Sequence, residues 1–465
     1  MEWSGKSVLV LGLGDTGLSA IHWLARRGAR LRAADTRAAP PALGAIRAAQ
    51  PALRVDLGAF DTALLEGVDA IVASPGIALR EPLLRAALGR GIEVVGDVEI
   101  FAREVARRGG ARVLGVTGTN GKSTVTALAD AMCRAASLRS VACGNIGVPV
   151  LDALDRQGAA PEVFVVELSS YQLETTSSLA LDAATVLNVT QDHLDRYDSM
   201  DEYAAAKARI FRRCAVRVVN RDDARTLAMA TGGERCLTFG LSKPRSEREW
   251  GLDEARATLL NGARPIVATR EMALQGLHNA ANALAAHALG TAIGLPAEPM
   301  ATAIREFVGL PHRLERVAEF GGVRFYDDSK GTNVGATVAA LEGMRDPVVL
   351  IAGGEGKGQD FAPLGAAVRE HARAVVVIGR DAPAIAAALA GAGVPLARAE
   401  SMDEAVEAAF AFARPGDAVL LSPACASFDM FRNYAHRGEV FAAAARALGT
   451  GHSSKPDVPC PPKPR

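Results

Sequence analysis

Short apolar runs alternate along most of the chain with longer segments rich in alanine, leucine and arginine. The first run, Ser7–Leu11, is followed by a glycine-rich turn and by a helical segment that extends to about Arg27. Buried parallel strands have continuous apolar sequences, and their alternation with helices is typical of βα units. The pattern therefore predicts an α/β protein with mainly parallel sheets.

The strand-like runs fall into three series, which predicts three α/β domains. A chain of 465 residues is also longer than one hydrophobic core usually organises. The first series contains Ser7–Leu11, Ala70–Ala73 and Gly91–Val95, the second contains Arg112–Val116, Val163–Val166 and Ala184–Val189, and the third contains Val348–Ala352, Ala374–Ile378 and Ala418–Leu421.

The domain boundaries are expected between these series. The first lies near residue 95, because the next strand leads into a new glycine loop. The second lies near Leu310-Pro311, where the proline would end a preceding helix. The end of the chain is rich in Pro, Ser and Lys without periodicity, which predicts disorder. The expected domains are residues 1–95, 96–310 and 311–450, followed by a tail at 451–465.

The composition excludes several classes of function. Lys and Arg total 52, as do Asp and Glu, so no net field attracts nucleic acid or an anionic membrane. The six cysteines are scattered without a C-x-x-C pair, as expected in a reducing compartment. No apolar stretch is long enough to span a bilayer, and the N-terminus lacks the features of a signal peptide. We expect a cytoplasmic protein with no nucleic acid and no membrane among its partners.

The first glycine-rich turn, Gly12–Gly17, fits the G-x-G-x-x-G pattern between a strand and a helix. Asp35 ends the next strand, about where an acid that binds a ribose is expected. Glycines let the backbone approach a diphosphate at a helix N-terminus, where N–H groups and the helix dipole favour negative charge. These residues leave three interpretations open: NAD(P) binding, binding of another nucleotide diphosphate, or a tight turn without a ligand.

A second glycine-rich run, Thr117–Thr124, also follows a strand and precedes a helix, expected over Val125–Ala135. Its glycines allow backbone N–H groups to converge on phosphate oxygens, Lys122 adds a cation, and the hydroxyl residues after it can coordinate Mg²⁺. The run departs from the strict G-x-x-x-x-G-K-[ST] pattern, because Val116 stands where the first glycine belongs. It predicts a nucleotide phosphate at a helix N-terminus.

The sequence Thr-Gly-Thr-Asn-Gly-Lys-Ser-Thr of this run resembles the variant phosphate loop of the Mur ligases, and their relative folylpolyglutamate synthetase has a similar loop. Further segments resemble the same family in the family's order, over about residues 8 to 441. They are Gly144–Gly147, Glu167–Glu174, Asn188–Tyr197, Gly276–Asn282, Leu310–Arg313, Asp327–Asn333 and Leu421–Ser427. The resemblance implies a Rossmann-like N-terminal domain, a central mononucleotide-binding domain of P-loop type and a Rossmann-like C-terminal domain.

The resemblance also implies an activity: ATP-dependent ligation in cytoplasmic peptidoglycan precursor synthesis. The implied substrates are UDP-N-acetylmuramoyl-L-alanine and D-glutamate, joined through an acyl phosphate and a tetrahedral intermediate. The implied cofactors are ATP and a pair of Mg²⁺ ions, and we expect a monomer. Another Mur ligase or a folylpolyglutamate synthetase-like amide ligase is the alternative within this class. From the residues alone, an NAD(P)-dependent dehydrogenase and a P-loop ATPase acting as a switch or motor are further alternatives.

The implied metal ligands are Ser123, Glu167, His193 and Lys207, the last as a carbamate. Glu167 ends an apolar strand, which puts its carboxylate at the sheet edge where α/β sites form. A lone histidine beside a strand is more often structural than a ligand, and Lys207 by itself would be a solvated lysine of a helix expected over Asp201–Arg213. The resemblance reverses both interpretations, and carbamylation by CO₂ would require a neutral lysine amine.

The other implied positions divide by ligand. D-Glutamate carries two carboxylates, so its pocket needs cations and hydroxyl donors. Lys330 follows Asp327-Asp328, which by itself looks like a surface run, and Gly331 and Glu355 stand where the family has Ala and Asp. The implied catalytic residues are Lys122, His193, Lys207 and Lys330; the ATP contacts are Gly118, Thr119, Asn120, Gly121, Lys122, Ser123, Thr124, Asn279, Asn282, Arg313 and Asp328; the UDP-substrate contacts are Gly14, Asp15, Thr16, Thr36, Arg37, Ser74, Gly76 and Asn145; and the D-glutamate contacts are Lys330, Thr332, Lys357, Ser427 and Tyr434.

Overall fold

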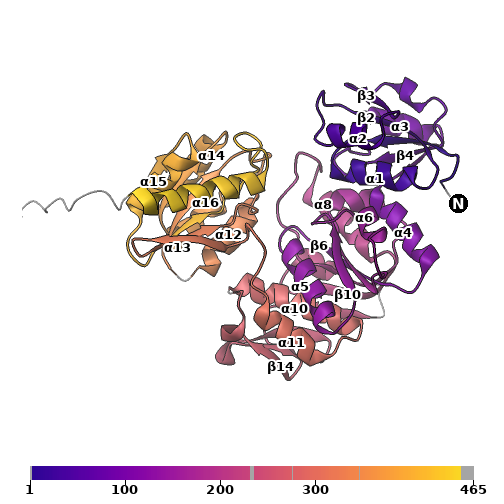
Figure 1. The fold of residues 1–465 in the computed structure, drawn as a ribbon. Coiled ribbons are helices and arrows are strands. Elements are labelled where there is room, and N and C mark those ends of the chain that lie inside the picture. The colour runs from indigo at the N-terminus through magenta and orange to yellow at the C-terminus, as the bar shows by residue number, and fades with distance from the viewer. Residues whose placement is uncertain (1–2, 231–234, 275, 345, 452–465) are drawn as a thin grey trace, which may run out of the picture. The chain divides into compact units, whose positions relative to one another are not determined.

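The computed structural model describes residues 3–230, 235–274, 276–344 and 346–451 (Figure 1). These residues form two compact units. The first contains the chain up to Val189 together with Arg196–Val308, and the second contains Thr190–Asp195 and the chain from Gly309 onward. Almost all of the tail expected at 451–465 lies outside the described residues.

The first sheet of the first unit has five parallel strands in the order β3-β2-β1-β4-β5. Its middle strand, β1, contributes Val8 and Val10 to the core on the α1 side and Leu9 and Leu11 to the core that contains α3. A continuous apolar run is therefore buried on both faces. The elements are β1 (Ser7–Leu11), α1 (Asp15–Ala25), β2 (Arg30–Asp35), α2 (Leu43–Ala49), β3 (Arg54–Leu57), η1 (Thr62–Leu65), β4 (Ala70–Ala73), α3 (Pro82–Gly89), β5 (Glu93–Val95) and α4 (Asp97–Arg108).

The second sheet has nine strands in the order β14-β13-β12-β11-β10-β9-β6-β8-β7. Strands β6 to β12 pair in parallel, whereas β12, β13 and β14 pair antiparallel. The elements are β6 (Arg112–Thr117), α5 (Lys122–Ala135), β7 (Ser140–Gly144), α6 (Val150–Leu154), β8 (Val163–Glu167), α7 (Ser170–Glu174), β9 (Leu181–Val186), α8 (Met200–Ala208), η2 (Arg209–Phe211), β10 (Cys214–Asn220), α9 (Ala224–Ala228), β11 (Cys236–Phe239), β12 (Glu249–Asp253), η3 (Glu254–Arg256), β13 (Thr258–Asn261), β14 (Arg264–Ala268), η4 (Thr269–Glu271), α10 (Leu277–Ala292) and α11 (Ala297–Glu306).

The sheet of the second unit has six strands in the order β15-β16-β20-β17-β18-β19, and β15 alone pairs antiparallel. Its strand β17 contributes Val348, Leu350 and Ala352 to a core with α12, α13 and α14, and Val349 and Ile351 to a core with α15 and α16. Helices therefore cover both faces. The elements are β15 (Glu315–Phe320), β16 (Val323–Asp327), α12 (Val334–Gly343), β17 (Val348–Gly353), α13 (Leu364–His371), β18 (Ala372–Ile378), α14 (Ala382–Leu389), β19 (Leu396–Arg398), α15 (Met402–Phe412), β20 (Ala418–Leu421) and α16 (Tyr434–Gly451).

The predicted α/β fold with three domains and mainly parallel sheets is confirmed. Several element ends were wrong. The strand expected over Ala184–Val189 runs over Leu181–Val186, and the helix expected over Asp201–Arg213 ends at Ala208, followed by a 3₁₀ turn. The helix before Pro311 ends at Glu306, so the proline does not terminate it directly. No helix in the described part of the chain is both long and apolar enough to cross a membrane.

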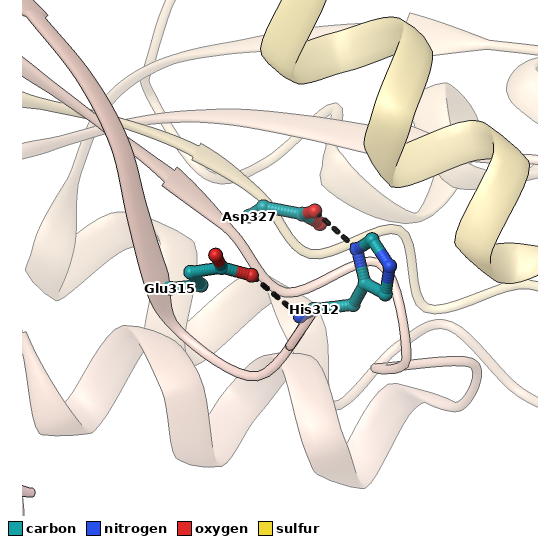
Figure 2. Close-up of side chains that lie close together, drawn as sticks. All are labelled: His312, Glu315 and Asp327. Carbon is teal, nitrogen blue, oxygen red and sulfur yellow. Dashed lines mark hydrogen bonds and ion pairs between the residues drawn. The ribbon is translucent and has the colours of Figure 1, made fainter. Parts of the chain in front are cut away.

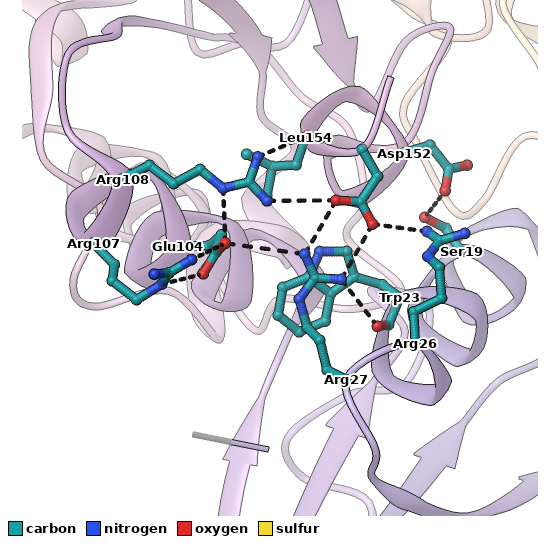
Figure 3. Close-up of polar contacts among 10 residues, drawn as sticks. Ser19, Trp23, Arg26, Arg27, Glu104, Arg107, Arg108, Asp152 and Leu154 are labelled. Carbon is teal, nitrogen blue, oxygen red and sulfur yellow. Dashed lines mark hydrogen bonds and ion pairs between the residues drawn. The ribbon is translucent and has the colours of Figure 1, made fainter. Parts of the chain in front are cut away.

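A network of ion pairs joins the first sheet's layer to the second within the first unit (Figure 3). Asp155, just after α6, pairs with Arg26 at 2.9 Å and with Arg27 at 3.1 Å, both from the end of α1. Ser19 of α1 donates to Asp152 of α6 at 2.7 Å, and Arg108 of α4 donates to the Leu154 carbonyl at 2.8 Å. Helices α1, α4 and α6 are thereby connected.

The same network borders a cavity of about 800 Å³ lined by five arginines and the buried Trp3 and Trp23. The guanidinium groups are met by four carboxylates, so little net charge is left for an anionic ligand. Arg27 also lies over the Trp23 ring at 3.6 Å. We interpret this region as a structural junction. The arginines are Arg26, Arg27, Arg103, Arg107 and Arg108, and the carboxylates are Glu93, Glu99, Glu104 and Asp155.

Candidate active site

Three loops after neighbouring strands of the first sheet carry most of the predicted UDP-substrate positions. Gly14, Asp15 and Thr16 begin α1, Thr36 and Arg37 follow β2, and Ser74 and Gly76 follow β4. Strand β1 lies between β2 and β4, so its glycine turn lies between the other two loops. The carboxyl ends of parallel strands meet at one edge of an open sheet, where ligands bind.

The glycine turn is closed by tight packing. Gly12 has a φ of +86°, and a Cβ on it would lie 2.8 Å from the Cβ of Ser74. A Cβ on Gly17 would lie 2.0 Å from the carbonyl oxygen of Gly12, so only glycine fits there. The hydroxyl of Ser74 donates to that same carbonyl at 2.8 Å. The loop after β4 is therefore fixed to the turn after β1.

Asp35 is occupied by groups of the protein itself. Its carboxylate accepts from the Leu13 and Arg37 N–H groups at 2.7 and 2.9 Å and from the Arg37 guanidinium at 2.9 and 2.6 Å. Hydrogen bonding to Arg37 lowers the pKa of Asp35 to about 2. Four hydrogen bonds use the acceptor capacity of a carboxylate, which leaves none for a ribose. This argues against the ribose contact that an NAD(P) site would make through Asp35.

The predicted phosphate loop joins β6 to α5, and both of its glycines lie against other elements. Gly118 has a φ of +152°, and a Cβ there would lie 2.9 Å from the Cβ of Leu187. Gly121 has a φ of +82°, and a Cβ there would lie 2.5 Å from Oδ1 of Asn282. Asn282 donates to Asn279 at 3.3 Å. The two predicted ATP contacts of α10 therefore lie beside the loop.

Asn188 holds the phosphate loop and was not among the predicted site residues. Its backbone carbonyl accepts from Thr119 N–H at 2.9 Å, its side-chain Oδ1 accepts from Asn120 N–H at 2.8 Å, and its Nδ2 donates to the Asn120 carbonyl at 3.1 Å. Lys122 Nζ donates to the carbonyls of Gly118 and Thr119 at 3.0 and 2.8 Å. Ser123 and Thr124 are buried in the first turn of α5. Asn188 and Lys122 thus hold the loop closed at the N-terminus of α5.

Glu167 lies where a divalent cation would be expected. It ends β8, and in the sheet it pairs with Val116, next to the start of the phosphate loop, and with Gly144. Its Oε1 accepts from the Asn145 side chain at 2.8 Å, whereas Oε2 is buried and has no hydrogen-bond partner among the described residues. A buried carboxylate oxygen without a partner is costly unless a cation meets it, so this group fits Mg²⁺.

Lys207 is buried, which corrects its interpretation from the residues alone as a solvated helix lysine. Only 2% of it is exposed. Its Nζ donates to the Gly118 carbonyl at 2.8 Å and lies 4.4 Å from the centre of the Tyr203 ring. The Tyr203 hydroxyl lies 3.3 Å from the hydroxyl of Thr119. Lys207 therefore contacts the phosphate loop through the Gly118 carbonyl. Its carbamylation stays a prediction.

His193 lies in the segment Thr190–Asp195, which belongs to the second unit. It has a φ of +57°, and its N–H donates to Oδ1 of Asp192 at 2.9 Å. Asp192 also accepts from Asn333 at 3.2 Å and forms an ion pair with Lys357 at 3.6 Å. The segment thus contacts Lys357, one of the predicted D-glutamate positions. The role of His193 as a metal ligand stays a prediction.

Two loops of the second unit carry the other predicted acceptor residues. Lys330 follows β16, and its Nζ lies 5.0 Å from the centre of the Tyr434 ring. Thr332 follows in the same loop, where its N–H donates to the Lys330 carbonyl at 3.0 Å. Ser427 is buried in the loop after β20, the strand that pairs with β16. Neighbouring strands therefore bring these side chains to one sheet edge.

Asp327 and Asp328 are buried, so their interpretation from the residues alone as a surface run was wrong. Burial raises the pKa of Asp328 to about 7, although Ser422 donates to it at 2.7 Å and Arg313 lowers the pKa. A Cβ on Gly331 would lie 2.6 Å from Oδ2 of Asp328 and 2.9 Å from the Ser422 hydroxyl. The glycine at 331 therefore leaves room for this buried pair.

Arg437 connects the loop of Lys330 with the loop of Ser427, and no sequence motif identified it. It is fully buried in α16. Its guanidinium donates to the Ser329 hydroxyl and carbonyl at 2.9 and 2.8 Å and to the carbonyls of Cys425 and Ala426 at 3.1 and 3.3 Å. Burial lowers its pKa to about 10. One side chain thus fixes the loop of Lys330 relative to the loop of Ser427.

His312, Glu315 and Asp327 lie close together at the start of the third sheet (Figure 2). His312 has a φ of +61°, its Nδ1 lies 2.6 Å from Oδ2 of Asp327, and its N–H donates to Glu315 at 3.0 Å. Histidine and carboxylates could also coordinate a metal, but here they already bond to one another. We interpret the cluster as a brace for the turn that carries Arg313.

Three family models match the chain in the order of its sheets. They are the Mur ligase MurD-like N-terminal domain over residues 6–96, the Mur ligase middle domain over 116–290 and the Mur ligase glutamate ligase domain over 312–425. Curated relatives match nearly the whole chain, and one from Methylobacillus flagellatus is 56% identical over 96% of this chain and 98% of its own length. The chain belongs to the Mur ligase family.

The relative from Methylobacillus flagellatus and one from Nitrosospira multiformis are both named UDP-N-acetylmuramoylalanine–D-glutamate ligase. The second is 55% identical over 96% of this chain and 97% of its own. Among solved structures, UDP-N-acetylmuramate-alanine ligase MurC from Thermotoga maritima has a TM-score of 0.61 at 19% identity, covering 95% of this chain and 99% of its own. MurF from Acinetobacter baumannii has the same score at 16% identity, covering 96% and 91%. These structures support the fold of this Mur ligase.

Proposed function

We propose that this Mur ligase adds D-glutamate to UDP-N-acetylmuramoyl-L-alanine at the expense of ATP, in the synthesis of peptidoglycan precursors. The observation that carries the proposal is the identity of 50–56% to full-length curated relatives that bear that name. The glutamate ligase domain over residues 312–425 supports the acceptor. The engagement of Asp35 by Leu13 and Arg37 argues against the dehydrogenase alternative.

The chemistry requires ATP because a carboxylate is a poor electrophile: its charge repels a nucleophile, and oxide is a poor leaving group. The L-alanyl carboxylate attacks the γ-phosphorus of ATP, and ADP leaves with the bridging oxygen. The amine of D-glutamate then attacks the acyl phosphate to give a tetrahedral intermediate. Collapse of this intermediate expels phosphate and leaves the amide. Positioning and charge neutralisation supply most of the catalysis in such transfers.

The phosphate loop would bind ATP through the N–H groups at the start of α5 and through Lys122. Family members use ATP and Mg²⁺. Ser123 and Glu167 would hold Mg²⁺, which supplies positive charge at the phosphate oxygens. The buried Oε2 of Glu167 supports this role. A pair of ions, with His193 as a further ligand, stays part of the proposal.

Lys207 would act as a carbamate, an anionic ligand next to the metal. Its burial and its place behind Gly118 support a role in the site. The amine must lose a proton before it attacks CO₂. Protein prepared with ¹³C-bicarbonate should show a carbamate carbon resonance that is missing in Lys207→Ala. Full activity of Lys207→Ala would contradict the proposal.

D-Glutamate would bind through its two carboxylates to the cations and hydroxyls of the second unit. Lys330, Lys357, Thr332 and Ser427 are the candidates, and the Tyr434 ring would border the pocket. The UDP end of the other substrate would bind at the loops after β1, β2 and β4 and near Asn145. We further propose a monomeric enzyme that works in the cytoplasm.

Phosphate release tests the proposal directly. The purified chain is supplied with ATP, Mg²⁺, UDP-N-acetylmuramoyl-L-alanine and each enantiomer of glutamate. Turnover that needs both substrates and prefers D-glutamate is the expected result. Turnover with ATP alone, or with lysine or meso-diaminopimelate in place of glutamate, would contradict it.

A further inference from the structure

Arg196 links the loop after β4 to the second sheet's layer, and we propose that it is a positioning residue for the UDP-linked substrate. The proposal rests on the proposed function, in which that loop binds the UDP end. It assigns Arg196 the task of setting where the loop lies relative to the phosphate loop of the same unit. No direct contact between Arg196 and a reacting atom is required.

The guanidinium of Arg196 has three partners from two parts of the first unit. One nitrogen, Nη2, forms an ion pair with Oε2 of Glu174 at 2.8 Å. The other, Nη1, donates to the Gly76 carbonyl at 3.3 Å. The Cζ of Arg196 lies over the Tyr171 ring, 4.2 Å from the ring centre. Only 10% of the Arg196 side chain and 17% of the Glu174 side chain are exposed, so their ion pair is largely shielded from water, whereas Gly76 lies at the surface.

The partners of Arg196 on α7 are themselves held in place. Ser169 and Gln172 form a capping box at the start of this short helix. Glu174 accepts a second hydrogen bond from the Tyr197 hydroxyl at 2.6 Å. Arg209 donates to the carbonyls of Glu174 and Thr176 at 3.0 and 3.1 Å, at the helix C-terminus. Arg196 therefore reaches Gly76 from a fixed platform.

The loop that Arg196 holds is continuous with the glycine turn. Gly76 lies two residues after Ser74, whose hydroxyl donates to the Gly12 carbonyl at 2.8 Å. The Ile77 N–H donates to the Ser74 carbonyl at 3.0 Å, which closes the loop into a turn. A shift of the Gly76 end would therefore be passed to the turn where we place the diphosphate. The L-alanyl carboxylate at the other end of the substrate accepts the phosphoryl group and must reach the γ-phosphate, so this distance affects the rate.

Arginine suits this position better than lysine. A guanidinium can stack on an aromatic ring while two of its nitrogens bond to different acceptors. A lysine ammonium could keep the ion pair with Glu174, but it could not also stack on Tyr171 and reach Gly76. Arg196→Lys therefore tests whether the positive charge alone is sufficient, or whether the contacts with Tyr171 and Gly76 are also needed.

The test compares kinetic constants of Arg196→Ala and Arg196→Lys with those of the wild type. In Arg196→Ala we expect the KM for UDP-N-acetylmuramoyl-L-alanine to rise about tenfold or more and kcat to fall, because the substrate is held in the wrong place. The KM for ATP should change less than about twofold. Arg196→Lys should lie between the alanine variant and the wild type.

Arg85→Ala is the matched control. Arg85 and Arg196 both line a cavity of about 460 Å³. Arg85 is exposed, and it makes none of the contacts of Arg196 to Gly76, Glu174 and Tyr171. If loss of positive charge in the cavity caused the effect, both alanine variants would show it. An equal rise in the KM for the UDP substrate in Arg85→Ala and Arg196→Ala would overturn the inference.

A double-mutant cycle with Ser74→Ala gives a second, independent check. Both residues act on the same loop in this scheme, so their effects on the KM for the UDP substrate should be less than additive. Unchanged KM values in Arg196→Ala, or equal increases for ATP and for the UDP substrate, would refute the positioning role. A wild-type chain without turnover on the UDP substrate would instead refute the proposed function, so the two failures are distinguishable.

Discussion

Asp328 is a buried carboxyl group that lies at a predicted nucleotide position. Its pKa of about 7 is above the value near 3.9 of an unfolded chain. Between those pH values the folded protein keeps a proton that the unfolded chain has released, so the stability contributed by Asp328 is lost as the pH rises through this window. Asp328→Asn removes the free-energy cost of ionising this buried group at high pH, because the amide stays neutral.

We therefore expect Asp328→Asn to be more stable than the wild type at pH 8, by about 2–4 kcal/mol. The difference should disappear near pH 4, where both side chains are neutral. Urea unfolding at the two pH values measures it. At the same time, the variant should bind ATP more weakly if Asp328 contacts the nucleotide. A stability difference that does not depend on pH would contradict the explanation.

Arg437 gives the second prediction at this scale. Removal of its side chain takes away four buried hydrogen bonds to the two loops, and Arg437→Ala should lower the free energy of unfolding by about 3–5 kcal/mol. Arg437→Lys, which keeps the charge, should fold and show a raised KM for D-glutamate. Arg446→Ala, an exposed arginine on the same helix, is the control and should change neither quantity. Similar stability of Arg437→Ala and Arg446→Ala would show that the buried contacts contribute little.

Individual residues were predictable where a motif fixed their backbone. Gly118, Gly121 and Glu167 lie as the sequence indicated, at a helix N-terminus and a strand end. Lys207 was not predictable from its residues, because the alanines of α8 lie on buried and exposed sides alike and its hydrophobic pattern does not mark the buried side. Arg437 gave no signal either, because three of its four acceptors are backbone carbonyls, which no sequence motif marks.

At the scale of elements, the contact between α5 and α10 determines how the phosphate loop can respond to substitution. Gly121→Ala would place a Cβ 2.5 Å from Asn282 and force an L-residue to a φ of +82°. We expect the affinity for ATP to fall about tenfold or more, as measured by calorimetry. Gly158→Ala has the same kind of backbone strain, with a φ of +103°, but no atom within 4 Å of the added Cβ. An equal loss in both variants would point to strain alone.

The junction of α1, α4 and α6 provides the other prediction at this scale. Burial acts to raise the pKa of Asp155, but its pairs with Arg27 and Arg26 outweigh this and hold the pKa below the usual value. Asp155→Asn leaves the arginines with less compensation and should reduce stability by about 1–2 kcal/mol at low salt. The reduction should shrink in 1 M NaCl, because salt screens the repulsion.

Glu247→Gln is the control for this junction, since its pair with Arg264 is fully on the surface, with 80% and 82% of the side chains exposed. It should have no measurable effect on urea unfolding at either salt concentration. If Asp155→Asn also had no measurable effect, the ion pairs of the junction would not contribute to the stability of the protein.

At the scale of the whole molecule, the sequence predicted how many domains there are and that their sheets are mainly parallel. It did not predict the antiparallel strands β13 and β14, which extend the second sheet, nor β15 in the third. These strands are partly exposed and lack the continuous apolar runs that mark buried parallel strands. The order of the strands in each sheet could not be predicted from the sequence either, because strand pairing depends on contacts between residues far apart in the chain.

The segment Thr190–Asp195 comes from the middle of the chain yet belongs to the second unit. A fragment that begins at Gly309 would therefore lack Asp192 and its contacts with Asn333 and Lys357. The C-terminal domain is for this reason not a self-contained module that can be excised, or exchanged between homologues, at one cut. A chimaera that takes it from another ligase would need the matching six-residue segment from the same donor.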